Sequence, residues 1–176
     1  VSITAQNTLG VQASLPLPLS LINQQFASLA TDFKIRACKT GMLADAEHVA
    51  TVAENLRHYD WGPLTLDPVM IAKGGAQLLA DDAIATLRTQ LLPLATVLTP
   101  NLPETEVLTG SRIKTTADFK QAAHQLQQMG AKNIIIKGGH LDYQSQAADY
   151  VLYADGQDEW LTTPRIATKR THGTGD

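Results

Sequence analysis

Short apolar runs alternate along the chain with longer segments in which apolar residues recur every three or four positions. The short runs predict strands, and the longer periodic segments predict helices. We expect strands at residues 1–4, 35–38, 64–67, 96–99 and 133–137, and helices at 18–30, 45–57, 81–92, 103–109 and from a cap at Thr116 to a stop at Gly130. This alternation is typical of βαβ units, so the pattern predicts one α/β domain with a parallel sheet.

A different pattern follows the last predicted helix and strand. Residues 150–153 and 159–162 are predicted strands, and Asp155-Gly156 lies between them. Because this dipeptide favours a tight turn, we expect an antiparallel hairpin at an edge of the sheet.

Composition narrows the class of partner. The chain has 176 residues, 44% of them hydrophobic, a net charge of −3 and an isoelectric point near 5.9. A broad basic surface for nucleic acid or an anionic membrane is therefore not expected, and a small-molecule partner is. No apolar run reaches membrane-spanning length, and the lone Cys38 cannot form an internal disulfide. We expect a cytoplasmic protein in which Cys38 is buried and inert.

The candidate site is predicted from where the strands end. In open α/β sheets, ligands bind beyond the carboxyl ends of the strands. Polar segments rich in Gly and Pro follow the predicted strands at 39–43, 67–75, 100–104 and 137–140. P-loop NTPases, hydrolases with a GxSxG nucleophile and dinucleotide-binding proteins are not predicted. The chain has no complete P-loop motif, no GxSxG and no GxGxxG.

The last four residues predict an anion-binding turn. Gly173, Thr174 and Gly175 allow a turn whose backbone N–H groups converge on an anion, and the carboxylate of Asp176 follows. Asp176 could then act as a general base on a substrate hydroxyl while the turn holds a phosphoryl group. Simple capping of a helix by Thr174 or Asp176 is the alternative.

Four further residues at strand ends suit phosphate and metal chemistry. Lys137 could contact phosphates, or could be a solvated lysine in a turn. Asn101 and Glu104 could hold Mg²⁺ directly or through water, although Asn101 could simply cap a helix. Asp67 could act on magnesium or a bound water, or could merely begin a turn.

Taken together, six ordered segments resemble a known family. TAQNTLGV, KTGML, DPVMIAKGG, LTPNLPE, KGGH and THGTG resemble the hydroxymethylpyrimidine and phosphomethylpyrimidine kinases of thiamine biosynthesis. The resemblance implies a three-layer, ribokinase-like domain over residues 1–176 with a mostly parallel sheet flanked by helices. It also implies a homodimer and ATP- and Mg²⁺-dependent phosphorylation of 4-amino-5-hydroxymethyl-2-methylpyrimidine and then of its monophosphate.

The resemblance also implies roles for individual residues. Gln6 matches the position that hydrogen-bonds the aminopyrimidine, and Met42 and Val69 match apolar walls of its pocket. Lys137 matches an ATP-phosphate contact, and Asn101 and Glu104 match the region near magnesium and the phosphates. Residues 173–175 match the anion hole, and Asp67 matches an acid of the site, which we assign with Glu104 to the metal.

Two departures from the family pattern keep alternatives open. Many members carry Cys after the Gly-Thr-Gly turn, whereas Asp176 is typical of pyridoxal and sugar kinases of the same fold, so pyridoxal or pyridoxine kinase is the alternative. The family's first strand with its glycine-rich loop, and the helices after the anion hole, have no counterpart in these residues. We therefore expect a chain truncated at both ends, and a ligand-binding module without catalysis is the alternative from another class.

Overall fold

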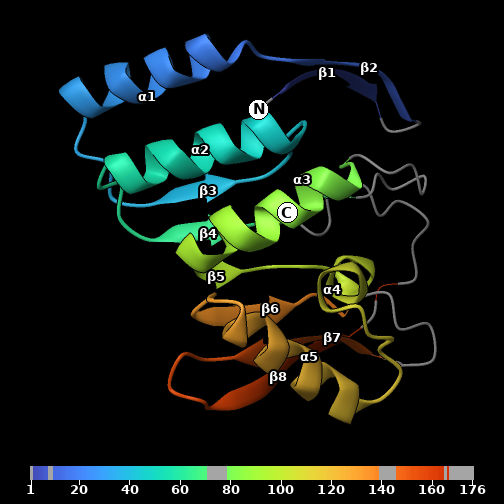
Figure 1. Ribbon diagram of the computed structural model, residues 1–176. Coiled ribbons are helices and arrows are strands. Elements are labelled where there is room, and N and C mark those ends of the chain that lie inside the picture. The colour runs from blue at the N-terminus through green and yellow to red at the C-terminus, as the bar shows by residue number, and fades with distance from the viewer. Residues whose placement is uncertain (1, 8–9, 71–78, 139–145, 165, 167–176) are drawn as a thin grey trace.

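The computed structural model describes residues 2–7, 10–70, 79–138, 146–164 and 166 (Figure 1). Its main feature is a sheet of six strands in the order β3-β4-β5-β6-β7-β8. These strands are β3 (Cys38–Thr40), β4 (Leu64–Leu66), β5 (Ala95–Leu98), β6 (Asn133–Ile136), β7 (Gln146–Leu152) and β8 (Asp158–Pro164). β3 to β6 are parallel, whereas β7 and β8 are antiparallel to their neighbours.

Helices connect the parallel strands and pack beside one another. They are α1 (Leu19–Asp32), α2 (Ala46–His58), α3 (Asp81–Thr86), α4 (Leu102–Thr109) and α5 (Thr116–Gln128). α1 packs on α2, α2 packs on α3, and α5 packs on β6 and β7. Figure 1 shows these helices along the six-stranded sheet, which confirms the predicted α/β class with a mostly parallel sheet flanked by helices.

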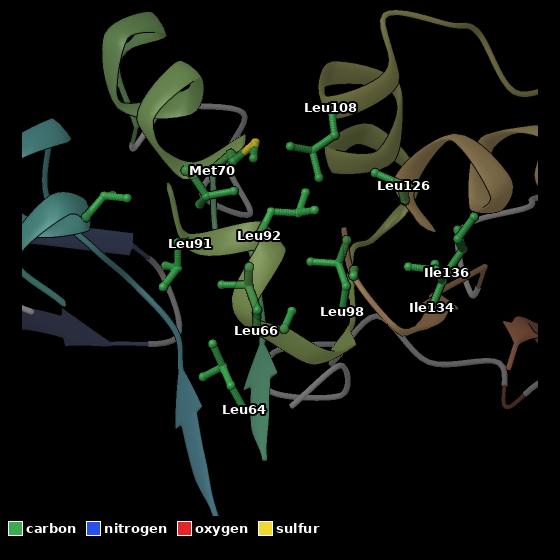
Figure 2. Packing of buried hydrophobic residues seen from close by; sticks show 14 of the residues in the cluster. Leu64, Leu66, Met70, Leu91, Leu92, Leu98, Leu108, Leu126, Ile134 and Ile136 are labelled. Atoms are coloured by element: carbon green, nitrogen blue, oxygen red, sulfur yellow. The ribbon is translucent and has the colours of Figure 1, made fainter. Parts of the chain in front are cut away.

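The core lies between the helices and the sheet, where leucines dominate (Figure 2). Burial alternates along β4 and β6, as expected where successive side chains point to opposite faces of the sheet. The buried residues are Leu64, Leu66, Ile134 and Ile136, whereas Thr65 between the two leucines is only half-buried. The largest fully buried side chains are Tyr150, Phe119, Ile22, Leu66, Met70, Leu79, Leu91, Leu92, Leu98, Leu108, Leu126 and Ile134. Burial of each such leucine contributes about 1.5–3 kcal/mol, so these side chains stabilise the packing of the helices on the sheet.

Two predicted turns are confirmed by their backbone angles. Gly110 ends α4 in the left-handed region at φ 70°, which glycine adopts without steric cost. Gly156 has φ 86° in the turn between β7 and β8, so the predicted antiparallel hairpin is present.

The first predicted strand lies in a different sheet from the one expected. β1 (Ser2–Asn7) pairs antiparallel with β2 (Gly10–Pro16), which the sequence pattern did not reveal, and the two form a separate sheet. Most side chains of this hairpin are exposed, so the pattern of apolar positions there carries no signal of a covered face.

The third strand begins later than predicted. The expected strand at 35–38 is instead Cys38–Thr40, because β3 pairs only with β4 and β4 begins at Leu64. The backbone N–H of Cys38 donates to the carbonyl oxygen of Pro63 at 3.0 Å, which joins the two segments where the strands begin.

Two helix predictions also need correction. Thr115, not Thr116, caps α5: its Oγ1 accepts the N–H of Asp118, and a carboxylate oxygen of Asp118 accepts the N–H of Thr115. Thr116 has Phe119 at the matching position, which offers no acceptor. The α-helix predicted at 81–92 ends at Thr86, and a π-helical turn and a 3₁₀ turn containing Pro93 complete the helical segment.

Candidate active site at the carboxyl ends of the strands

Asp67 lies at the centre of a group of charged side chains. It follows β4 directly, its side chain is only 6% exposed, and its backbone N–H donates to the carbonyl oxygen of Thr40 at 3.1 Å. Its Oδ1 lies 3.2 Å from Nζ of Lys137, and its Oδ2 lies 3.4 Å from Nζ of Lys39. A buried carboxylate between two ammonium groups is compensated, and the two lysines place two positive charges at this edge of the sheet.

Lys137 is positioned by the strand next to Asn101. The two residues form an isolated parallel bridge, and the backbone N–H of Lys137 donates to the carbonyl oxygen of Pro100 at 2.9 Å. Because β5 lies between β4 and β6, the lysine side chain spans the end of β5 to reach Asp67. It thus joins the ends of three neighbouring strands.

The residue after Lys137 admits only glycine. A Cβ on Gly138 would overlap the backbone carbonyl oxygen of Ala148 on β7. The N–H of Gly138 donates to a carboxylate oxygen of Asp149 at 2.9 Å. This close approach to β7 fixes the direction in which Lys137 leaves the sheet.

Glu104 connects two strand exits through its carboxylate. Its Oε2 accepts the backbone N–H of Asn101 at 2.8 Å, and its own N–H donates to Oδ1 of Asn101 at 2.9 Å, which completes a capping box. Its Oε1 accepts the backbone N–H of Met70, beyond β4, at 3.5 Å. The predicted capping role of Asn101 is therefore confirmed, and Glu104 is a structural link as well as a candidate ligand.

Burial raises the pKa of Glu104 above its ordinary value. The N–H of Asn101 and the charge of Lys137 act in the opposite direction and favour the carboxylate, whereas the negative charge of Asp67 adds to the rise. The protonation of Glu104 is therefore coupled to both charges at the centre of the group.

The structure brings some of the predicted site residues together and leaves others apart. Met42 follows β3 and Val69 follows β4, and both are half-buried at the same edge of the sheet as Asp67. Gln6 is exposed on β1 of the two-stranded sheet, not at the end of a strand of the six-stranded sheet. Gly173, Thr174, Gly175 and Asp176 lie outside the described residues.

Sequence reasoning gave no role to Lys39 or Asp149. Lys39 lies in a predicted strand exit, but its approach to Asp67 depends on the parallel register in which Lys39 is opposite Thr65. Asp149 lies within β7 and has no motif around it, so only the fold shows that its carboxylate accepts the backbone N–H of Gly138.

Three other observations bear on the chemistry of the described residues. Burial raises the pKa of the Cys38 thiol, which favours the inert thiol that we expected over a nucleophile. Within the described ranges, no group of three or more His, Cys, Asp or Glu could hold a metal ion by itself. None of the described helices is long and apolar enough to span a bilayer.

The fold and the charged strand ends define an α/β protein with a group of charged side chains at the carboxyl edge of its sheet. A family model described as phosphomethylpyrimidine kinase matches residues 1–176. The chain therefore belongs to the phosphomethylpyrimidine kinase family, as its motifs predicted.

Relatives of known name agree with this family. Over 176 residues the chain is 52% identical to the hydroxymethylpyrimidine/phosphomethylpyrimidine kinase of Haemophilus influenzae. The aligned region covers 99% of this chain and 65% of that protein. It is 45% identical to the protein of the same name from Bacillus subtilis, of which it spans 64%. The chain thus spans less than two thirds of the length of these relatives.

Solved structures confirm the predicted ribokinase-like fold. The phosphomethylpyrimidine kinase of Clostridium difficile is 38% identical and superposes with a TM-score of 0.81, covering 93% of this chain and 68% of that one. A pyridoxal kinase of Bacillus subtilis, solved as an ADP complex, is 32% identical with a TM-score of 0.85, covering 99% of this chain and 65% of that one. Kinases for both candidate substrates therefore share this fold.

Proposed function

We propose that the chain carries the phosphoryl-transfer site of a hydroxymethylpyrimidine/phosphomethylpyrimidine kinase of thiamine biosynthesis. ATP would phosphorylate the hydroxymethyl group of 4-amino-5-hydroxymethyl-2-methylpyrimidine, and a second transfer would convert the monophosphate to the diphosphate. The observation that supports this proposal most strongly is the family match over residues 1–176, a range that includes Asp67, Lys39 and Lys137.

Positive charge at the strand ends suits the phosphates of ATP. Lys137 and Lys39 both face Asp67, and their ammonium groups are two cationic contacts that a phosphate at this edge can use. Asp67 would hold both ammonium groups in place before the nucleotide binds. Preorganised charge of this kind is the main catalytic contribution of a protein in phosphoryl transfer.

The transfer itself would use the last residues of the chain. Asp176 would accept the proton of the substrate hydroxyl while the hydroxyl oxygen attacks the γ-phosphorus of ATP. The bond between the γ-phosphorus and the oxygen that bridges it to the β-phosphate breaks, and ADP leaves. The N–H groups of Gly173, Thr174 and Gly175 would hold the phosphoryl oxygens. Gln6 would hydrogen-bond the aminopyrimidine, and Met42 and Val69, which lie at the edge that carries Asp67, would form apolar walls of its pocket.

Mg²⁺ fits the site as an ion that arrives with the nucleotide. Each carboxylate oxygen of Asp67 already faces an ammonium group, and each carboxylate oxygen of Glu104 already accepts an N–H. Asp67 and Glu104 would therefore hold the ion mainly through its water molecules, and the ion would neutralise phosphate charge.

An assay of ADP production with the pyrimidine and with pyridoxal, each with ATP and Mg²⁺, tests the activity and the substrate together. We expect turnover with the pyrimidine, and loss of turnover with retained nucleotide binding in an Asp176→Asn variant. Near-normal turnover in that variant would exclude Asp176 as the base. A strong preference for pyridoxal would favour the alternative kinase, which the pyridoxal kinase structures of this fold support.

Binding without turnover would favour a third reading, a ligand-binding module. Calorimetry with ATP-Mg²⁺ and with the pyrimidine separates this case from an inactive or unfolded chain. We also propose a homodimer from the family resemblance, which light scattering on the eluted protein tests directly. The cytoplasmic location stays a prediction.

A further inference from the structure

A second concave site lies at the opposite end of the sheet from Asp67. A cavity of about 450 Å³ is formed by the loop between α1 and β3 and the loop between α2 and β4. Both loops lie at the left of Figure 1, where β3 and β4 begin. The phosphoryl-transfer residues follow the other ends of these strands, so this cavity is separate from the proposed active site.

Basic residues outnumber acidic residues in the lining of the cavity. Lys34, Arg36 and His58 line it, and Asp60 is its one acidic lining residue. One carboxylate oxygen of Asp60 accepts the backbone N–H of Gly62 at 3.4 Å. Among the described residues, no carboxylate lies within ion-pair distance of Lys34 or Arg36. The lining therefore complements an anion.

Aromatic rings form the apolar part of the same cavity. The aromatic lining residues are Phe33, Tyr59 and Trp61. Phe33 is 59% exposed. Trp61 stacks on Phe26 with ring centroids 4.3 Å apart and an angle of 16° between the planes, which holds the indole in place.

Trp61 keeps its indole nitrogen below the accessible surface, so a ligand in the cavity meets the ring of Trp61 and not this nitrogen. Its Nε1 is buried and has no hydrogen-bond partner among the described residues. A buried donor without an acceptor costs about 1–3 kcal/mol. The nitrogen is a polar group that the packing of the chain itself does not explain.

We propose that this cavity binds a small molecule that combines an aromatic ring with a phosphate or carboxylate group. Lys34 and Arg36 hold the anionic group, and the aromatic side chains contact the ring. This site is additional to the proposed kinase site, and its occupancy does not depend on phosphoryl transfer.

Two-dimensional ¹H–¹⁵N NMR of the chain with phenyl phosphate as the probe tests the proposal. The chain has two tryptophans, and a Trp160→Phe variant assigns the two indole signals. Trp160 packs against Phe119 and Tyr150, with ring centroids 5.1 Å away in each case, so its signal is an internal control. We expect a saturable shift of the Trp61 indole signal and none of the Trp160 signal.

Charge and ring contributions are then separated. The double variant Lys34→Gln, Arg36→Gln should raise the dissociation constant about tenfold, whereas Arg88→Gln, an exposed cation on another segment, should change it less than about twofold. Inorganic phosphate and benzyl alcohol should each bind at least about tenfold more weakly than phenyl phosphate.

Several results would overturn the proposal. One is the absence of a saturable shift of the Trp61 signal. Another is a double variant that binds phenyl phosphate as tightly as the unaltered chain does. The third is inorganic phosphate or benzyl alcohol binding as tightly as phenyl phosphate. Lys34 and Arg36 are exposed, so their substitution leaves the core intact, and far-UV circular dichroism checks that both variants are folded.

Discussion

Glu104 shows how one side chain can serve both the fold and the site. Its carboxylate accepts one backbone N–H from the start of α4 and another from the segment after β4, while 3% of the residue is exposed. Burial penalises the charged form, so the pKa of Glu104 is raised. Its protonation state therefore affects the stability of the connection that positions Asn101.

The raised pKa of Glu104 predicts how stability changes with pH. Between the ordinary glutamate pKa, 4.5, and the higher pKa of the folded chain, the folded state binds more protons than the unfolded state. The free energy of unfolding should therefore fall as pH rises through this interval, relative to a Glu104→Gln variant that cannot titrate. Urea unfolding of both proteins over a pH series measures the difference. A difference that stays constant or grows with pH would contradict this reading.

At the scale of elements, capping chemistry decides where a helix begins. Hydrophobic periodicity located α5 well, since Phe119, Ala123 and Leu126 are buried as the three- and four-residue spacing requires. It could not choose between two adjacent threonines, because the choice depends on which of them has an acceptor three residues later. Asp118 makes Thr115 the cap.

Substitution of the two threonines tests this assignment. Thr115→Ala should lower the free energy of unfolding by about 1 kcal/mol through loss of the cap, whereas Thr116→Ala should change it by less than about 0.5 kcal/mol. Thermal or chemical unfolding of both variants gives the comparison. Equal losses, or a larger loss at Thr116, would show that the cap is assigned to the wrong residue.

The contact between the end of β6 and β7 makes a second prediction at this scale. Gly138→Ala places a methyl group against the backbone carbonyl of Ala148, which cannot rotate away as a side chain can. We expect a loss of about 1–3 kcal/mol in unfolding free energy. Gly41→Ala is the control, since a Cβ there meets nothing within 4 Å and should be neutral or slightly stabilising. Similar stabilities of the two variants would argue against the close approach.

Strand prediction succeeded where the sheet is buried and failed at its margin. β4, β5 and β6 lie within a residue of their predicted positions because their apolar residues face a covered layer. β3 is at an edge and begins where its one partner allows, which local sequence does not encode. The pairing of β1 with β2 is likewise set by contact between two exposed segments.

For the whole molecule, the rule that ligands bind beyond the carboxyl ends of strands located most of the candidate site. Asp67, Asn101, Glu104 and Lys137 come from three strand exits and meet at one edge. The contribution of Lys39 required the register of two strands and the length of a side chain, so it emerged only from the coordinates. Gln6 lies on the separate hairpin, and its contact with the aminopyrimidine stays a prediction that rests on the motif alone.

The central claim is that this edge of the sheet binds nucleotide phosphates through Lys137. Lys132 and Lys137 flank the same strand, β6, at its opposite ends, so they form a matched pair for substitution. Calorimetric titration of the chain and of its Lys137→Gln and Lys132→Gln variants with ATP and Mg²⁺ measures the contribution of each charge. We expect Lys137→Gln to weaken binding about tenfold and Lys132→Gln to leave it within about twofold. Unchanged affinity in folded Lys137→Gln, or an equal loss in Lys132→Gln, would contradict the assignment of the site.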